Sequence, residues 1–191
     1  MQALKDRISK DGILLPGGIV KVDSFLNHQL DPSLLYEIGR AFYLHYKDCG
    51  ITKVLTIEAS GIAPAVMTAL ALNVPAVYAK KQKSTNISHD VYMSRVFSYT
   101  KNTTYDVVVS KDYLKSSDKV LIIDDFLATG HALRGLIDMI NQSGASIAGV
   151  GIVIEKTFQE GGKELRSTGL RIESLAKITS ISEDGIEFEN E

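Results

Sequence analysis

The sequence is short of cysteine and of surplus charge, and each shortage excludes a class of protein. Its 191 residues include one cysteine, Cys49, so an internal disulfide framework is excluded. Lysine and arginine number 21 against 23 aspartate and glutamate, which gives a net charge of −2. A dedicated nucleic-acid-binding protein normally carries a basic surplus, so we expect no nucleic-acid partner. The histidines and the cysteine also lack the spacing of a zinc site.

The sequence also lacks the pattern of a signal peptide or of a membrane-spanning helix. Residues 1–10 carry charges and no apolar run, whereas a signal peptide needs one. Residues 59–79 are uncharged and long enough to span a bilayer, but a glycine, two prolines and an asparagine interrupt them. We interpret this stretch as a buried helix, a turn and a buried strand. A cytoplasmic protein without a membrane partner is expected.

What the sequence does contain is an alternation of strand-like and helix-like segments. Runs that are apolar on both faces are typical of parallel strands covered by helices. These runs are Val54–Ile57, Ala76–Ala79, Val120–Ile123 and Val150–Ile154. The length suits a single domain, residues 1–191, and no internal repeat is visible. The pattern predicts an α/β fold with a mainly parallel central sheet and helices on both faces.

Helical spacing of apolar residues predicts the helices that accompany these strands. Asp31 followed by Pro32 is a typical helix start. The predicted buried stripes are Leu34, Leu35, Ile38, Phe42 and His45; Ile62, Val66, Ala69 and Leu70; and Leu133, Leu136, Ile137 and Ile140.

Two regions interrupt the alternation. Residues 80–117 are polar and rich in tyrosine, and only Asp106–Val109 reads as a strand with a possible partner. A long insertion of this kind in a compact domain is usually a functional lid or a loop, so we predict a flexible lid over about 80–117. Residues 178–189 alternate around Glu183-Asp184-Gly185, which predicts a hairpin.

The most informative segment runs from Val120 to Ala132. A buried strand leads to two adjacent carboxylates, Asp124 and Asp125, and then through Thr129-Gly130 into a helix. Ligands of open α/β sheets bind at the carboxyl ends of strands, and backbone N–H groups at a helix start suit a phosphate. Carboxylates repel a phosphate but suit a hydroxyl-rich or transiently positive neighbour. A phosphorylated sugar combines both features.

Plainer interpretations of this segment exist. Adjacent acids after a strand often cap a helix, and Thr-Gly is common in turns. The segment is not a nucleotide P-loop, because no Gly-Lys-Ser/Thr follows, and its glycine spacing does not fit a dinucleotide fingerprint.

The segment resembles the signature of type I phosphoribosyltransferases, which has four apolar residues, two acids and a loop with Thr-Gly. Segments across nearly the whole chain are similar to the bacterial members that act on xanthine: Lys21–Gln29, Glu58–Pro64 and Ile154–Gln159. The resemblance implies the fold of that family, with a small hood beside the sheet and a flexible lid. It also implies purine salvage, in which the phosphoribosyl group of phosphoribosyl pyrophosphate passes to xanthine, with Mg²⁺ bound mainly through the substrate, and a homodimer.

The resemblance also assigns roles by position. Ala128, Thr129, Gly130, His131 and Ala132 would hold the 5′-phosphate, and Asp124 and Asp125 would be catalytic, facing the ribose hydroxyls and the developing positive charge. Ser60 and Gly61 would form the pyrophosphate loop, and Lys81, with Lys80 and Lys83, would neutralise the leaving pyrophosphate. Many family members have a glycine and a threonine where His131 and Ala132 stand, which shifts the phosphate contacts toward backbone amides and Thr129.

The resemblance places Lys156 and Asn27 at the base, with the backbone near Val20 closing the pocket. We expect Phe158 to lie against the purine face. An ammonium group suits the carbonyls and the anion of xanthine, and an amide can pair with a ring edge that both donates and accepts. Without the resemblance, Asn27 reads as a turn cap before Pro32 and Lys156 as a solvated strand end.

Other functions stay open from sequence alone. Guanine and hypoxanthine are weaker candidate substrates, and adenine is disfavoured because it presents a donor to the lysine. A non-catalytic regulator that senses phosphoribosyl pyrophosphate is an alternative from another class. The homodimer that the resemblance implies could use the apolar residues near Phe25 and Leu26 as its contact surface.

Overall fold

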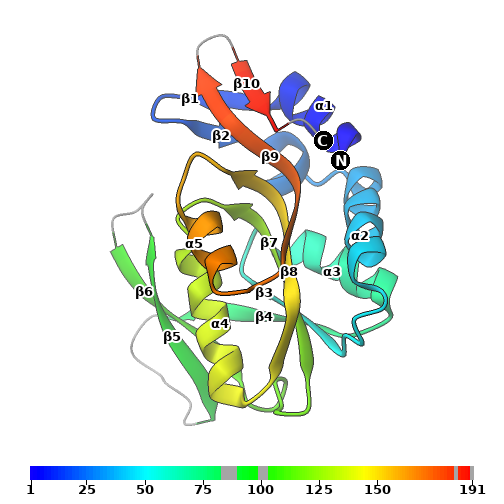
Figure 1. The fold of residues 1–191 in the computed structure, drawn as a ribbon, viewed down its shortest axis with the longest axis vertical. Helices are drawn as coiled ribbons and strands as arrows, with labels where there is room; N and C mark the ends of the chain where they lie inside the picture. The colour runs from blue at the N-terminus through cyan, green and yellow to red at the C-terminus, as the bar shows by residue number, and fades with distance from the viewer. Residues whose placement is uncertain (83–89, 99–102, 183–184, 190–191) are drawn as a thin grey trace.

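The computed structural model describes residues 1–82, 90–98, 103–182 and 185–189, and a single sheet forms its centre. The strands of that sheet are β3 (Lys53–Ile57), β4 (Ala76–Gln82), β5 (Val91–Ser98), β6 (Thr103–Ser110), β7 (Lys119–Leu127), β8 (Ser146–Lys156), β9 (Ile172–Ser182) and β10 (Gly185–Phe188). Within the described ranges their spatial order is β10-β9-β8-β7-β3-β4-β6-β5 (Figure 1). Neighbours from β9 to β4 are parallel, and the other pairs are antiparallel. The predicted α/β fold is confirmed.

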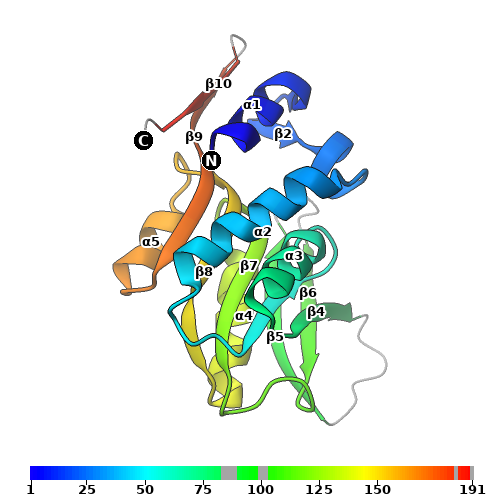
Figure 2. The same ribbon diagram turned by 90° about the vertical axis from the view of Figure 1, so that its right-hand side faces the viewer.

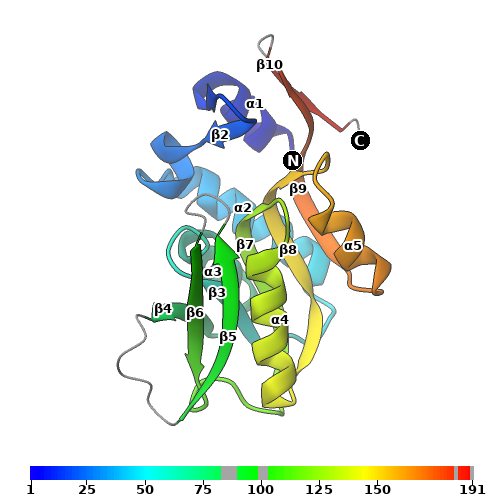
Figure 3. The same cartoon turned by 90° about the vertical axis from the view of Figure 1, so that its left-hand side faces the viewer.

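Helices cover both faces of the sheet. On one face lie α2 (Pro32–Tyr46) and α3 (Ile62–Leu72), and on the other lies α4 (His131–Ser143) (Figures 2 and 3). Leu121 belongs to the core under α2 and α3, whereas its neighbour Ile122 belongs to the core under α4. Because both faces of β7 are buried, its sequence is apolar without alternation.

Local signals set the limits of two helices as predicted. The Asp31 carboxylate accepts hydrogen bonds from the N–H groups of Ser33 and Leu34, and Pro32 is the first residue of α2. Asn73, with φ of 56°, ends α3 before the turn into β4. Residues 59–79 therefore form a helix and a strand. Among the described residues, no helix is both long enough and apolar enough to cross a membrane.

Two predicted buried stripes are partly wrong. On α3, Val66 is 46% and Leu70 is 67% exposed, while Ala65 and Ala69 face the core. Small side chains are the ones that let this helix lie close to its neighbours, so the larger residues point outward.

On α2, the last position of the stripe is also displaced by one residue. His45 is exposed, and the neighbouring Tyr46 is buried in its place, where its hydroxyl donates to the Val150 carbonyl (2.7 Å).

The segment 80–117 has more regular structure than predicted. Asp106–Val109 lies in β6 as expected, but β5 pairs with β6 along its length, and Val96, Val107 and Val109 are buried beneath α4. The edge strand β5 is held to α4 by the Gln142 amide, which accepts from the Met93 N–H (3.3 Å) and donates to the Met93 carbonyl (2.8 Å). Lys83, His89 and the rest of 83–89 and 99–102 lie outside the described residues, so the lid stays a prediction.

A small subdomain, which we call the hood, lies at one end of the sheet (Figure 1). Its elements are α1 (Gln2–Asp11), β1 (Ile13–Leu15), β2 (Ile19–Lys21) and a π-helical turn η1 (Asp23–Asn27), with the β9–β10 hairpin beside them. The hairpin is confirmed, although residues 183–184 at its tip are not described. Phe25 and Leu26 themselves are buried in the core, whereas the nearby Leu30 is exposed, so the expected contact surface near them stays a prediction.

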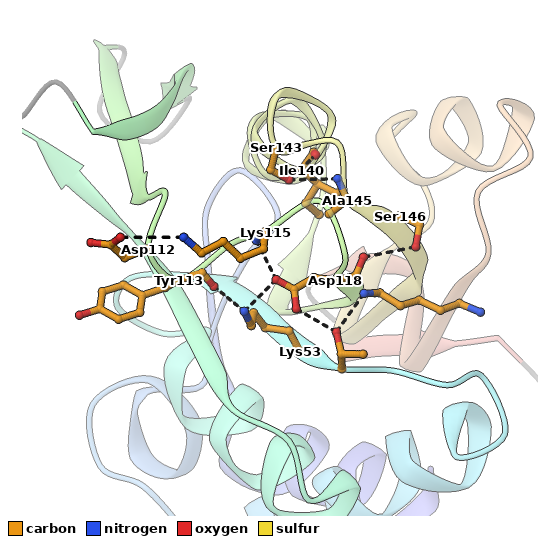
Figure 4. A network of polar contacts seen from close by, with 11 residues as sticks. Lys53, Asp112, Tyr113, Lys115, Asp118, Ile140, Ser143, Ala145 and Ser146 are labelled. Atoms are coloured by element: carbon orange, nitrogen blue, oxygen red, sulfur yellow. Dashed lines mark hydrogen bonds and ion pairs between the residues drawn. The ribbon is translucent and has the colours of Figure 1, made fainter.

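At the amino ends of β3 and β7, an ion pair joins the sheet to the segment before β7. The Lys53 ammonium contacts the Asp118 carboxylate (2.8 Å) and the Tyr113 carbonyl (2.6 Å), and Asp118 also accepts from Thr52 and from the Lys115 N–H (Figure 4). Burial by itself would raise the pKa of Asp118, but these hydrogen bonds outweigh it and lower that pKa. The ionised carboxylate therefore stabilises the fold.

We predict that Asp118→Asn lowers the free energy of unfolding at pH 7 by about 2 kcal/mol, the scale of a charge-assisted hydrogen bond. Because the pKa of Asp118 is lowered in the folded state, its contribution is present above the ordinary value of 3.8 and is lost as the pH falls below it. Urea unfolding at several pH values checks this. Asp112→Asn, at an exposed pair with Lys115, is the control and should change little. Equal effects of the two variants would contradict the prediction.

Candidate active site

The predicted catalytic acids are buried near the carboxyl end of β7. Asp124 is 4% and Asp125 is 8% exposed. The strand does not end before them as the sequence suggests, because pairing with β8 continues as far as Leu127. The two carboxylates are therefore carried by the sheet itself, which holds them more rigidly than a loop would.

The surroundings of Asp124 disfavour its charge. Burial raises the pKa of the Asp124 carboxyl well above its usual range, and the adjacent Asp125 carboxylate raises it further, while Lys81 acts in the opposite direction. Burial also raises the pKa of Tyr105, and the Asp124 charge contributes to that increase. Asp124, Lys81 and Tyr105 thus form one electrostatic cluster that favours a cation or a positively charged centre beside Asp124.

The predicted phosphate loop, residues 128–132, connects β7 to α4. Gly130 has φ of +79°, a left-handed conformation that favours glycine, and α4 begins at His131. The first N–H groups of a helix have no partners within that helix, so this turn can offer them to an anion. The His131 ring packs edge-on against Phe97 of β5, with ring centroids 5.9 Å apart. The loop is therefore contacted by β5 of the 80–117 segment.

The predicted pyrophosphate loop lies beside the acids. Ser60 and Gly61 connect β3 to α3, after a cis peptide between Glu58 and Ala59. A β-carbon at Gly61 would overlap the Thr56 hydroxyl and lie 2.9 Å from a carboxylate oxygen of Asp124. Only glycine allows this approach, which brings the Ser60–Gly61 backbone to the carboxylates of β7.

Lys81 lies within β4, which extends to Gln82, rather than after a strand end as predicted. Its N–H donates to the Glu58 carboxylate (2.6 Å), and its ammonium lies 5.2 Å from the centroid of the Tyr105 ring. The ammonium of Lys80 lies over Tyr78 instead. Of these two lysines, Lys81 is the one that acts on Asp124.

The predicted base-binding residues lie at the junction of sheet and hood. Lys156, at the end of β8, donates to the Gly18 carbonyl (2.9 Å), and its ammonium is 5.8 Å from the centroid of the Phe126 ring. Burial lowers the pKa of Lys156. Lys156 is thus half-buried and anchored, not a solvated strand end. Val20 is buried in β2, and the exposed Phe158 ring lies beside Gly18.

Asn27 lies at the end of η1 and lines an apolar hollow of about 460 Å³ together with Ser60. Its Oδ1 atom is buried and has no hydrogen-bond partner among the described residues. Asp31, not Asn27, caps α2, so the turn-cap interpretation of Asn27 is wrong. Within the described part of the chain, no hydrogen bond joins Asn27 to Lys156. The structure brings Asn27 to the pyrophosphate loop and Lys156 to the hood.

Sequence reasoning missed several residues of this site. Glu58, Tyr105 and Phe126 contact predicted site residues, and Arg134 donates to the Thr129 carbonyl in the phosphate loop (2.8 Å). Phe126 follows the two acids directly and was the easiest to recognise. Tyr105 is brought to Lys81 by sheet pairing, for which the sequence carries no local signal.

The donor set fits Mg²⁺ bound largely through a substrate. Mg²⁺ at phosphate-bearing ligands is held by one or two carboxylates together with substrate oxygens and water. Asp124 and Asp125 supply such a pair, and the raised pKa of Asp124 indicates a place where a cation would be favoured. Among the described residues, no group of three or more His, Cys, Asp and Glu side chains is placed to hold a metal.

We predict that Asp124→Asn raises the melting temperature at pH 7. An acid whose pKa is raised by folding costs stability as the pH rises above its ordinary value of 3.8, because the ionised form is disfavoured in the folded protein. The gain should therefore be small near pH 4 and larger at pH 7 in thermal unfolding. Asp31→Asn is the control, since the hydrogen bond from Leu34 helps to lower the pKa of Asp31. A gain that does not change with pH would contradict this assignment.

Comparison with known proteins agrees with this geometry. A family model described as the phosphoribosyl transferase domain matches residues 28–174. The xanthine phosphoribosyltransferase of Pseudomonas aeruginosa is 53% identical over 188 residues, which are 98% of this chain and 99% of that protein. The xanthine phosphoribosyltransferase of Ligilactobacillus salivarius is 51% identical over the full length of both chains.

Solved structures share the fold. The adenine phosphoribosyltransferase of Thermoanaerobacter pseudethanolicus superposes with a TM-score of 0.75 at 21% identity, covering 92% of this chain and 98% of that one. The Trypanosoma brucei enzyme, in complex with AMP, pyrophosphate and ribose-5-phosphate, gives 0.74 at 21% identity over 95% and 82%. At this identity the likeness concerns the fold alone. The family match and the full-length relatives decide the assignment: the chain belongs to the phosphoribosyltransferase family.

Proposed function

We propose that this protein transfers the 5-phosphoribosyl group of phosphoribosyl pyrophosphate to xanthine, giving xanthosine 5′-monophosphate and pyrophosphate in purine salvage. The observation that carries the choice of base is the anchored ammonium of Lys156, held by the Gly18 carbonyl above Phe126 at the edge of the hood. Two relatives that are more than half identical over nearly the whole chain are xanthine phosphoribosyltransferases. Both lines support the same substrate.

The reaction exchanges one bond at the anomeric carbon of the ribose. A ring nitrogen of the base forms a bond to that carbon, the bond to pyrophosphate breaks with its electron pair on the leaving oxygen, and the base loses a proton. Positive charge develops on the sugar meanwhile. Asp124 and Asp125 are already buried and fixed by β7, so they stabilise that charge without reorganising.

Two loops hold the ends of the sugar diphosphate. The N–H groups of Ala128–Ala132 at the start of α4 bind the 5′-phosphate, where the helix dipole favours negative charge. The Ser60–Gly61 backbone, close to Asp124, binds the pyrophosphate group, and Lys81 neutralises its charge. When bound, Mg²⁺ would be held by the carboxylates of Asp124 and Asp125 together with substrate oxygens, and it would offset the negative charge on the leaving group.

Lys156 and Asn27 recognise the base. The Lys156 ammonium can exchange the Gly18 carbonyl for a xanthine carbonyl, and its charge favours the xanthine anion. The Asn27 Oδ1 atom is buried and no described residue donates to it, so it gains a full hydrogen bond when a ring N–H of the base reaches it. Adenine has an amino group, which is a donor, where xanthine has a carbonyl. Since the Lys156 ammonium is also a donor, adenine would bind less well. Guanine and hypoxanthine keep that carbonyl and are the runner-up substrates.

A homodimer is part of the proposal. Leu30, at 47% exposure, and Val66 line the apolar hollow on the α2–α3 side, and Leu70 lies one turn beyond Val66 on α3. An apolar surface of this kind is typical of an interface. The location in the cytoplasm stays a prediction.

We predict that the wild-type protein, offered xanthine, guanine and hypoxanthine together with phosphoribosyl pyrophosphate and Mg²⁺, forms mainly the xanthine nucleotide. In Lys156→Met, the KM for xanthine should rise more than tenfold, because a charge-assisted hydrogen bond is lost, while the KM for phosphoribosyl pyrophosphate stays within about twofold. Steady-state kinetics with both substrates varied measures this.

Lys21→Met is the matched control, since Lys21 is an exposed lysine of the hood that pairs with Asp23. It should leave both KM values unchanged. Equal losses for base and sugar diphosphate in Lys156→Met would overturn the base assignment. Binding of phosphoribosyl pyrophosphate without turnover of any base would favour the sensing regulator instead.

We predict that Leu70→Glu converts a dimer to a monomer in analytical ultracentrifugation, because a carboxylate in an apolar interface loses hydration without gaining a partner. Met93→Glu, on the edge strand that packs against α4, is the control and should remain dimeric. A wild-type monomer, or a dimer unaffected by Leu70→Glu, would show that this surface has no such role.

A further inference from the structure

The phosphate loop is supported from behind by a short helix. This helix, α5 (Gly161–Ser167), begins with Gly161 packed on the loop: a β-carbon there would overlap the Ala128 carbonyl and the Thr129 backbone. The two backbones are in direct contact. Any movement of α5 would therefore be transmitted to the peptide groups of the loop.

A buried ion pair holds α5 to the sheet. Glu155 of β8 is buried, and both of its carboxylate oxygens accept from the Arg166 guanidinium (2.6 and 2.7 Å). The Ser174 hydroxyl of β9 donates to the same carboxylate. Burial would raise the pKa of Glu155, but the hydrogen bonds from Arg166 and Ser174 lower it overall. The far half of α5 is thus fixed to two strands.

Arg134 connects this fixed helix to the loop. Its Nη1 atom donates to the Thr129 carbonyl (2.8 Å), and its Nη2 atom forms an ion pair with the Glu164 carboxylate of α5. The guanidinium is planar and rigid. The ion pair with Glu164 therefore fixes the direction in which Arg134 donates to the Thr129 carbonyl. Arg134 is on α4, whereas Glu164 is 30 residues away along the chain.

The hydrogen bond to the Thr129 carbonyl determines how the next peptide N–H is directed. In a planar trans peptide, the carbonyl and the following N–H point in opposite directions. Since the Thr129 carbonyl is turned toward Arg134, the Gly130 N–H is turned away from it. Gly130 has φ of +79°, in a region where a glycine backbone has several accessible conformations. The guanidinium therefore restrains the orientation of the Thr129–Gly130 peptide, in addition to the packing of Gly161 on it.

We propose that Arg134 is a positioning residue for the 5′-phosphate: held by Glu164, it orients the Thr129–Gly130 peptide so that the Gly130 N–H is directed to the phosphate. The proposal rests on the proposed function for the presence of a phosphate in this loop. Arg134 acts through the backbone and need not touch the ligand. Its charge, behind the loop, also favours an anion in front.

The test compares the folded full-length variants Arg134→Met, Arg134→Lys, Glu164→Gln and Lys163→Met. Methionine keeps the aliphatic bulk of Arg134 without a donor. We expect Arg134→Met to raise the Kd of ribose 5-phosphate, measured by calorimetry, and the KM of phosphoribosyl pyrophosphate by about tenfold, with the KM of xanthine unchanged. Arg134→Lys should recover part of the loss, since lysine can reach one partner but not both.

Lys163→Met is the matched control, because Lys163 is an exposed cation next to Glu164 whose ion pair is with Glu160. It should behave as wild type. Glu164→Gln keeps Arg134 but removes its anchor, so a loss smaller than that of Arg134→Met is expected. If Arg134→Met proves unfolded in thermal melts, Glu164→Gln still decides, and a wild-type Kd there would overturn the proposal.

Failure of this proposal differs from failure of the proposed function. Equal Kd values for ribose 5-phosphate in wild type, Arg134→Met and Lys163→Met would overturn the role of Arg134 and leave xanthine transfer intact. Binding of ribose 5-phosphate that weakens in Arg134→Met, without turnover of xanthine, would support Arg134 and overturn the choice of base. A wild-type protein that binds no ribose 5-phosphate would overturn both.

Discussion

The burial of two adjacent carboxyl groups at the end of β7 is the constraint on which the rest of this structure depends. Burying a charge is costly unless it is paired, and the raised pKa of Asp124 shows that the folded protein pays part of that cost. The neighbouring features fit around this pair. Glycine at position 61 brings a second loop to it, and Lys81 approaches it from β4. This pair of acids lowers the stability of the free protein. Positive charge that develops on a bound substrate would offset that cost, as is common for functional sites.

The fold by itself does not identify the base. Proteins that share this architecture at about one-fifth identity include adenine phosphoribosyltransferases, so the architecture is not specific to one base. In this chain the groups that would distinguish bases come from the periphery: Lys156 from the last residue of β8, Gly18 from the hood, and Asn27 from a π-helical turn. Under the proposed function, a substitution in the hood would alter recognition of the base and leave Asp124 and Asp125 in place.

Much of the site was predictable because its signals are local. The acids, the turn at Gly130 and the start of α4 are consecutive in sequence, and a strand, loop and helix in that order have few alternative arrangements. The length of β7 was underestimated, because charged residues usually mark the end of a buried strand. Here the pairing of β7 with β8 continues past both acids to Leu127. Val66 and Leu70 were misplaced because apolar periodicity does not distinguish a helix face in the core from an exposed apolar face.

Side-chain contacts between distant segments could not be predicted from the sequence. The pair of Arg134 with Glu164 depends on how α5 packs against the phosphate loop, and Tyr105 reaches Lys81 only through the antiparallel pairing of β6 with β4. Neither arrangement has a sequence pattern, since both follow from tertiary packing. Phe25 and Leu26 illustrate the same limit, because they are buried in a core that also contains residues from distant segments, such as Leu4 and Val153.

The amide of Gln142 has a consequence for how molecules of this protein meet one another. An unprotected outer strand invites pairing with a strand of another molecule, which can continue into fibres. On β5, the Gln142 side chain occupies the outward N–H and carbonyl of Met93 in the manner of a one-residue neighbouring strand. A strand of a second molecule therefore cannot pair with the Met93 backbone, which hinders edge-to-edge polymerisation of the sheet at that position.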